Sequence, residues 1–368
     1  MTEREARIAF NMIPTVGSVT VARLMSETGG SAADAYEIFP EKKDWTGCEP
    51  AWEREIEQAE KMHVRIVTEV DPDYPPLLRE IASPPLALYV VGDVSALSKA
   101  GVALVGTRRA TPYGHLTAER LAGDLVRRGW AVFSGLARGI DAAAHQGALM
   151  NKGVTVGVLG GALDRFFPED NRDLARRMVE KGGAVVSEFP FGRSPDVQTF
   201  PQRNRVVSGL SRGVVAVECP RQSGTLITCS RAAEQGRPVM AVPGRIDSRA
   251  SSGCLHLIRE GARLVTCVDD ILEELMPLGH SGDRPVASSH VPPMKKASSR
   301  PVRAVAPEVV VSEEEARLLR VISARGTLVE QVASESGLPI GKVNVLLVSL
   351  RLKGRVDYLP GNRVALRS

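Results

Sequence analysis

Apolar residues in the first 62 positions recur every three or four residues, as they do on one face of an amphipathic helix. The recurring positions include Ile8, Met12, Val19, Leu24, Trp52, Ile56 and Ala59. From residue 63 to about 277 the pattern changes to short β-branched runs that alternate with amphipathic stretches. The runs lie at 102–105, 131–133, 154–159, 184–186, 214–217, 239–242 and 263–265, and the stretches include 115–128, 171–181, 225–235 and 254–260.

These patterns predict a helical domain over residues 1–62 and an α/β domain over residues 63–277. Alternating strands and helices with apolar strand runs favour an extended Rossmann-like parallel sheet with helices on both faces. Ligands of such sheets bind at the carboxyl ends of the strands, in the loops that precede the helices. The functional residues are therefore expected in those loops.

The small N-terminal domain contains an apolar–turn–apolar segment, Ile13-Pro14-Thr15-Val16-Gly17-Ser18-Val19. Its pattern is SAM-like or helix–hairpin–helix-like, and the backbone N–H groups of such a turn can meet a phosphate. Thr15 stands where the helix–hairpin–helix motif usually has its first glycine. A structural helical cap is the alternative.

Residues 278–310 have the composition of a flexible basic linker. The segment contains five prolines and, after Arg284, four further cations without an accompanying acidic run: Pro285, Pro292, Pro293, Pro301, Pro307, Lys295, Lys296, Arg300 and Arg303. It could touch DNA or serve as a solvated spacer.

Residues 311–368 show the pattern of three helices followed by a hairpin, which predicts a winged-helix domain. Ser312 and Glu315 form the sequence of a capping box, and the hairpin turns at 360–362. The third helix offers polar side chains as a recognition helix would: Lys342, Asn344, Ser349, Arg351 and Lys353. The sequence is compatible with two functions of this domain, contact with duplex DNA or docking of a protein.

Composition excludes only a few classes of partner and site. The 368 residues carry a formal net charge of +4, which tolerates a polyanionic partner without demanding one, so any such partner must meet locally placed cations. The five cysteines include no Cys-x-x-Cys pair, which favours reduced thiols over a zinc site. No signal core and no membrane-length apolar run occur. We expect a cytoplasmic protein without a membrane partner.

The first two strand-end loops combine glycine, a hydroxyl group and arginine. Gly106, Thr107 and Arg108 follow the run at 102–105, where a helix N-terminus and a guanidinium could hold phosphate. The next loop contributes Ser134, Gly135, Arg138 and Gly139. Asp141 and His145 lie one helical turn apart there. They could form an acid–base pair, although a helix-capping Asp141 and a satisfied, partly buried His145 are favoured.

The remaining loops add aromatic rings and further cations. Phe166 and Phe167 are candidates for stacking on bases, with Asn171 close behind them, while core packing is the alternative for the rings. Further along stand the candidate phosphate ligands Arg203, Asn204, Arg205, Ser223, Gly224 and Thr225. Five loops of this kind would converge on one groove that binds an anion. No Walker A sequence and no dinucleotide-binding glycine motif occur, which disfavours a motor or a dehydrogenase.

Four motifs in order resemble the DNA-processing protein A (DprA/Smf) family. They are Gly106-Thr107-Arg108, the run from Ser134 to Asp141, the run from Phe200 to Arg205, and Ser223-Gly224-Thr225-Leu226. The resemblance is strong over residues 65–270 and looser at both ends of the chain. It implies a non-catalytic homodimer of natural transformation that protects single-stranded DNA and loads the RecA recombinase without a nucleotide cofactor. Arg108, Arg138, Arg203 and Arg205 would then face phosphates, and Phe166 or Phe167 would stack.

Two other classes compete with this hypothesis. Nucleotide phosphoribohydrolases share the sheet, but Thr228 occupies the place of their catalytic glutamate, so the general base is missing. A protein-binding scaffold would favour aromatic and apolar anchors over arginine–glycine loops.

Overall fold

The computed structural model describes residues 1–275, except Thr15 and Trp45, and residues 312–366, except 324, 325, 354 and 360–362. These residues form two compact units, the first within Met1–Ser289 and the second within His290–Ser368. The predicted linker at 278–310 lies outside the described residues.

The first unit is built on one nine-stranded sheet with the order β1-β2-β6-β5-β4-β3-β7-β8-β9. The neighbours from β6 through β3 to β9 run parallel, whereas β1 and β2 are antiparallel additions. The bounds are β1 Arg65–Thr68, β2 Ala87–Gly92, β3 Gly101–Gly106, β4 Ala131–Ser134, β5 Thr155–Val158, β6 Ala184–Ser187, β7 Val214–Glu218, β8 Val239–Ala241 and β9 Arg263–Leu264. The predicted Rossmann-like fold and its seven strand runs are confirmed. Strands β1 and β2 were not among the predicted runs.

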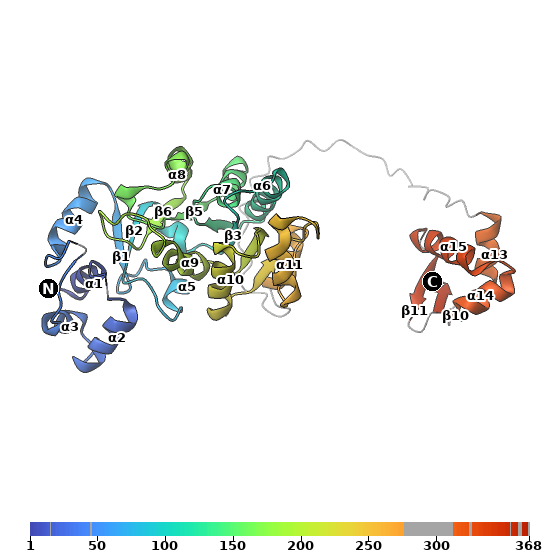
Figure 1. Cartoon of the computed structure of the whole chain (residues 1–368), viewed down its shortest axis with the longest axis horizontal. Coiled ribbons are helices and arrows are strands. Elements are labelled where there is room, and N and C mark those ends of the chain that lie inside the picture. Colours follow the sequence, from blue (N-terminus) through green and yellow to red (C-terminus); the bar gives the residue numbers. More distant parts are fainter. Residues whose placement is uncertain are drawn as a thin grey trace, which may run out of the picture. The chain divides into compact units, whose positions relative to one another are not determined.

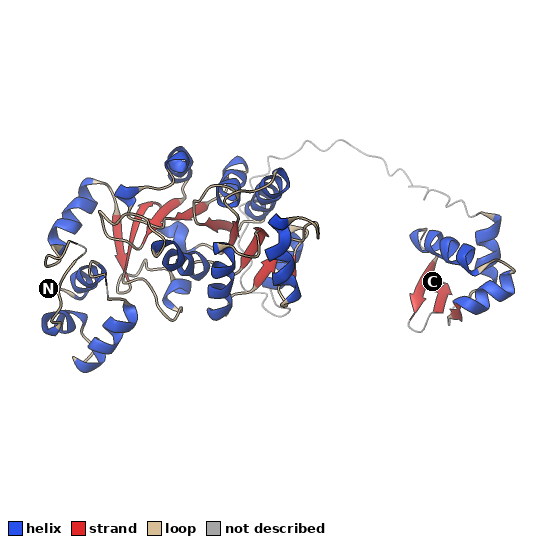
Figure 2. Cartoon of the chain, viewed as in Figure 1, coloured by secondary structure: helices blue, strands red, loops and turns tan. Residues whose placement is uncertain are grey.

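Helices cover both faces of this sheet, as Figure 2 shows. One face packs against α6 (Pro112–Arg127), α7 (Ile140–Met150), α8 (Arg172–Glu180) and α12 (Val268–Leu275). The other packs against α5 (Pro76–Arg79), α9 (Thr199–Gly209), α10 (Gly224–Glu234) and α11 (Ser252–Arg259). Strand residues alternate between the faces: Val102 and Leu104 pack with α6 and α7, while Ala103 and Val105 belong to the opposite core.

The connections change face between β3 and β7. Crossovers from β3 to β6 use α6, α7 and α8, and those from β6 to β9 use α9, α10 and α11. β3 and β7 are adjacent, so their carboxyl ends form a topological switch point, where the diverging loops leave a crevice.

The N-terminal helices pack against the sheet within the same compact unit (Figure 1). They are α1 (Glu3–Asn11), α2 (Ser18–Glu27), α3 (Ala32–Ile38) and α4 (Trp52–Lys61). Ile8 and Ala59 from these helices are buried with Ile66 and Tyr89 of β1 and β2. The domain boundary at residue 62 stays a prediction.

The second unit has the predicted winged-helix elements. Helices α13 (Glu313–Val321), α14 (Val329–Ser336) and α15 (Ile340–Leu352) pack with a sheet of β10 (Thr327–Leu328), β11 (Val356–Leu359) and β12 (Arg363–Leu366). The capping box is present: Ser312 accepts from the Glu315 N–H, and the Glu315 carboxylate accepts from the Ser312 N–H. Gly337 ends α14 with a φ of 68°, which glycine adopts without strain.

Candidate nucleic-acid interface

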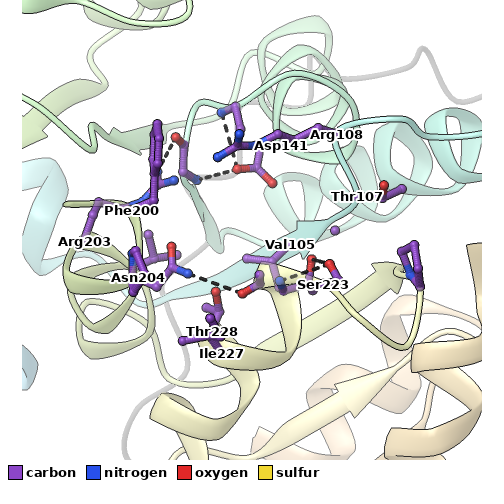
Figure 3. A pocket seen from close by; sticks show the side chains of 18 of the residues that line it. Val105, Thr107, Arg108, Asp141, Phe200, Arg203, Asn204, Ser223, Ile227 and Thr228 are labelled. Atoms are coloured by element: carbon purple, nitrogen blue, oxygen red, sulfur yellow. Dashed lines mark hydrogen bonds between the residues drawn. The ribbon is translucent and has the colours of Figure 1, made fainter. Parts of the chain in front are cut away.

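A cavity of about 470 Å³ lies at the carboxyl ends of β3, β4 and β7, at the switch point. Figure 3 shows its lining, in which the strand-end loops face residues of α9 and α10. We call this cavity the groove. Its predicted members are Gly106, Thr107, Arg108, Gly135, Arg203, Asn204, Ser223, Gly224 and Thr225. Most of the predicted loops therefore do converge.

The loop after β3 is fixed from both sides. The Thr107 N–H donates to the Glu218 carbonyl at 2.7 Å, and the Thr107 carbonyl accepts from the Ile140 N–H at 3.2 Å. A Cβ on Gly106 would lie 2.4 Å from Ile140 Cγ1, so only glycine fits at this close approach. The buried Glu218 carboxylate accepts from the N–H and the hydroxyl of Thr111, both at 2.8 Å. Glu218 was not among the predicted site residues.

This rigid loop presents two exposed cations. Among the described residues, neither the Arg108 nor the Arg109 guanidinium is paired with a carboxylate. Arg108 lies over the Phe200 ring, with Cζ 4.6 Å from the ring centroid. Both arginines line the groove. Arg109 and Phe200 were not among the predicted site residues, although both adjoin predicted motifs.

Arg203, in contrast, is built into the protein. Only 5% of its surface is exposed, and its guanidinium donates to the carbonyls of Gly135 and Val158. A Cβ on Gly135 would lie 2.1 Å from this guanidinium. Burial lowers the pKa of Arg203 to about 10, and the charge of Asp141 opposes that shift. Arg203 lines the groove while it holds the ends of β4 and β5 together.

The predicted roles of Asp141 and His145 need correction. Asp141 does not cap α7, because the N-cap residue is Gly139; its carboxylate accepts from the Gly135 and Ala137 N–H groups at 3.1 and 3.4 Å. Burial raises the pKa of Asp141, and Arg203 opposes that shift. His145 is fully buried, its Nδ1 lies 2.7 Å from the Thr155 hydroxyl, and burial lowers its pKa to about 3. The two residues are not hydrogen-bonded to each other in the described structure.

A small cavity beside the groove brings Phe167, Arg138 and Phe200 together. Phe167 is 47% exposed, and its ring centroid lies 6.3 Å from that of Phe200. Arg138 also lines this cavity but is ion-paired with Asp170 at 2.6 Å. Of the two predicted stacking rings, Phe167 is therefore the one that faces this cavity.

Three predicted residues have structural contacts instead. Phe166 packs at the edge of the core beneath α8, with Arg172 Cζ 5.1 Å from its ring centroid. Asn171 is buried and donates to the Leu136 carbonyl at 2.9 Å. The buried Ser134 hydroxyl donates to the Leu104 carbonyl at 2.6 Å. None of the three lines the groove.

The predicted cations of helix α9 lie on different sides of the helix. Arg203 and Asn204 line the groove, but Arg205 lies on another side of the helix and lines a different cavity. There its guanidinium is ion-paired with Glu188 and donates to the Ser83 carbonyl. Arg205 was expected in the groove because it flanks Asn204 at the start of a helix and belongs to a family motif, but helical geometry places it elsewhere.

Gly139 and the first residues of α10 have small side chains, and they determine the shape of their loops through the backbone. Gly139 has a φ of 77°, and a Cβ there would lie 2.3 Å from the Thr107 carbonyl oxygen. Ser223 is the N-cap of α10 and accepts from the Thr225 N–H at 3.2 Å. The space around Gly224 is open, so a ligand can approach the backbone at this helix N-terminus.

The polar side chains of the candidate recognition helix α15 contact α13. Lys342 Nζ lies 2.5 Å from Glu314, and Lys353 Nζ lies 2.6 Å from Glu315. The Ser349 hydroxyl also donates to Glu315 at 2.6 Å. Lys353 and Ser349 hold the pKa of the Glu315 carboxyl at about 2. The side chains of Asn344 and Arg351 lie outside the described ones.

No helix in the described part of the chain is long and apolar enough to cross a membrane. In the same part of the chain, no group of three or more metal-binding side chains is close enough to hold an ion.

The fold and the groove define a doubly wound α/β protein with an arginine–glycine crevice at its switch point, joined to a winged helix. The family model "DNA recombination-mediator protein A" matches residues 65–276, and "DprA winged helix domain" matches residues 302–362. The chain belongs to the DprA/Smf family.

Relatives and solved structures agree with this assignment. Protein Smf of Escherichia coli is 40% identical over 80% of this chain and 75% of its own length. DNA processing protein DprA of Streptococcus pneumoniae is 43% identical over 56% of this chain and 72% of its own. An X-ray structure of DNA processing protein A from S. pneumoniae matches with a TM-score of 0.60 and 34% identity, covering 74% of this chain and 99% of that one. A Helicobacter pylori structure matches with a TM-score of 0.51 and 28% identity over 57% of this chain and 95% of that one, and its title concerns the single-stranded DNA binding mode of DNA processing protein A.

Proposed function

We propose that the groove binds the phosphate backbone of single-stranded DNA. The observation that supports this most is the pair of exposed arginines, Arg108 and Arg109, on a rigid loop at the switch point and without carboxylate partners among the described residues. Unpaired guanidinium groups make charge-assisted, bidentate hydrogen bonds to phosphate. The H. pylori relative is described as a single-strand binder, which points to the same ligand.

Aromatic rings beside these cations suit a single strand better than a duplex. Phe167, which is 47% exposed, offers a face on which an unpaired base can stack, a contact worth about 1–3 kcal/mol per base. Bases in a duplex are stacked on each other and cannot use such rings.

We further propose that the protein acts in the cytoplasm as a homodimer that transfers the bound strand to the RecA recombinase during transformation. The family relationship is the support for this step. Light scattering tests the dimer. RecA filament growth on protein-covered single strands, with and without this protein, tests the loading.

We propose that the protein does not alter the DNA chemically. Thr228, which takes the place of the glutamate of phosphoribohydrolases, is buried in the groove wall. A hydroxyl group there is a poor general base at neutral pH. Release of a free base from nucleoside monophosphates would contradict this proposal.

The binding experiment is fluorescence anisotropy with a labelled oligo-dT, without nucleotide or metal, with unlabelled duplex as competitor. Salt-sensitive binding that duplex displaces poorly is expected. Equal displacement by duplex, or no binding at low salt, would contradict the proposal.

A further inference from the structure

Three side chains form a surface that continues the groove toward strand β8. Tyr113 belongs to the first turn of α6, Arg221 to the loop after β7, and Arg249 to the connection between β8 and α11. β3, β7 and β8 are neighbours in the parallel part of the sheet, so the loops that follow them lie side by side at its carboxyl edge. We call Tyr113, Arg221 and Arg249 the rim.

Hydrogen bonds join the two arginines of the rim to each other and to the groove. Pro220 and Gln222 line the groove, so Arg221 between them stands at its border. The Arg221 N–H donates to the Ser252 hydroxyl at 3.1 Å, and that hydroxyl donates to the Arg249 carbonyl at 2.7 Å. The rim is therefore continuous with the groove on the side of β8.

Tyr113 reaches the same loop from the helix on the other face of the sheet. Its hydroxyl donates to the Pro243 carbonyl at 3.0 Å, while 50% of the residue remains exposed. The next residue, Gly244, packs so closely against Ser251 that no Cβ fits there, which closes the loop that carries Arg249. An aromatic ring that is fixed at one end and exposed to solvent offers a face on which a base can stack.

The charges around the rim suit a polyanion. The loops that follow β3, β7 and β8 contain five arginines and one carboxylate, that of Asp247. This carboxylate is ion-paired with Arg245 at 2.7 Å within its own loop. In the part of the chain that the structure describes, the guanidinium groups of Arg221 and Arg249 are exposed and have no carboxylate partner. They can therefore bind phosphates without breaking an ion pair.

We propose that the rim binds the single strand where it leaves the groove, with Arg221 and Arg249 on phosphates and Tyr113 stacked on a base. The inference rests on the proposed binding of single-stranded DNA in the groove. Cations beside an exposed aromatic ring are the elements that bind single strands without sequence preference. β8 lies two strand steps from β3, or about 10 Å, which a few nucleotides span. A strand that extends beyond the groove therefore reaches the rim.

The test of the arginines compares the full-length variant Arg221→Ala/Arg249→Ala with the native chain, by anisotropy with a long oligo-dT across a salt series. We expect the slope of log affinity against log salt to fall by about 1.4, or about 0.7 for each lost phosphate contact. Lys181→Ala/Arg259→Ala is the matched control. It removes two exposed cations at the ends of α8 and α11, at the opposite edge of the sheet, and should leave the slope unchanged.

The possible outcomes separate the rim from the groove. A native slope in the rim variant, or an equal fall in the control, would overturn the inference and leave the groove intact, because binding by the native chain reports on the groove. Failure of the native chain to bind oligo-dT would overturn both.

The test of Tyr113 separates stacking from a structural role. Tyr113→Ala should weaken binding of the long oligo-dT about tenfold, whereas Tyr113→Phe, which keeps the ring and loses the bond to Pro243, should bind as the native chain does. An abasic strand of the same length offers no base, so the native chain and Tyr113→Ala should bind it equally. A similar loss on the abasic strand, or no loss on oligo-dT, would overturn the stacking role.

Discussion

The groove and helix α15 both present cations of the kind that bind nucleic acids, but the structure uses those cations differently. Arg108 and Arg109 are exposed and have no carboxylate partner among the described residues. In α15, Lys342 and Lys353 form ion pairs with Glu314 and Glu315 of α13. A cation that already pairs with a protein carboxylate gains little from a phosphate, because one favourable contact replaces another. The difference favours the groove as the DNA-binding region.

A similar contrast exists within the groove. Arg108 projects over Phe200, whereas Arg203 is buried with its donors on two backbone carbonyls. Two arginines in one wall thus have different functions: one is available to a ligand, and the other maintains the shape of the wall.

The largest effect is expected from Arg203→Ala. The substitution removes the guanidinium donor from the carbonyls of Gly135 and Val158 and the positive charge opposite buried Asp141. We expect a loss of about 3 kcal/mol in the free energy of unfolding. Urea denaturation measures it, and Arg176→Ala, at an exposed position of α8, is the control. Unchanged stability with weakened DNA binding would instead make Arg203 a phosphate ligand.

The double variant Arg108→Ala/Arg109→Ala should keep its stability and lose affinity. Each lost phosphate contact reduces the slope of log affinity against log salt by about 0.7 and costs about tenfold in affinity. Anisotropy with oligo-dT across a salt series measures both quantities. A salt slope equal to that of the native protein would show that neither arginine contacts a phosphate.

The winged-helix domain should lose stability as the pH falls below 4.5. The pKa of Glu315 is lowered from 4.5 to about 2. Its ion pair with Lys353 therefore contributes fully above pH 4.5, and that contribution is lost as the pH falls toward 2. The expected loss is about 1–2 kcal/mol. Amide NMR signals of α13 and α15 in the full chain report it, and Glu315→Gln should remove the pH dependence; persistence in that variant would assign it to another group.

A smaller effect is expected when a cation in α15 is freed from its ion pair, which tests the contrast between α15 and the groove. Glu314→Gln removes the partner of Lys342. We expect the salt slope for duplex binding to grow by at most about 0.9, the value for one phosphate contact. Lys342→Ala in the native background should leave that slope unchanged. A large loss of duplex binding in Lys342→Ala would show that this lysine contacts DNA despite its ion pair.

The smallest effect is expected from removing the second unit. A chain that ends at residue 275 keeps the whole groove, because every residue of its lining lies in the first unit. Affinity for oligo-dT should change by less than about threefold, well below the effect of one lost phosphate contact. Loss of binding by a truncated chain that still melts cooperatively would contradict the assignment to the groove.

The fold was predictable from sequence because strand runs and amphipathic helices have distinct periods. The seven parallel strands and the capping box of Ser312 and Glu315 were predicted correctly. Strands β1 and β2 were missed: they are antiparallel edge additions outside the βα alternation. Convergence of the strand-end loops followed from the parallel sheet, which places all carboxyl ends on one edge.

The role of each side chain in the site was less predictable. Arg203 and Arg205 are separated by one residue, yet helical geometry puts one in the groove and the other against Glu188. The partners of Lys342 and Lys353 come from another helix, so the charge of α15 could not be judged from its own sequence. Local sequence shows which groups exist, but long-range contacts decide which of them remain available.

Photocrosslinking with a bromodeoxyuridine-substituted single strand, followed by mass spectrometry of the full-length chain, tests the central claim most directly. Crosslinks should concentrate in peptides with Arg108, Phe167 and Phe200, and the double variant Arg108→Ala/Arg109→Ala should greatly reduce them. Crosslinks that concentrate in α15, with the groove peptides unmodified, would contradict the account.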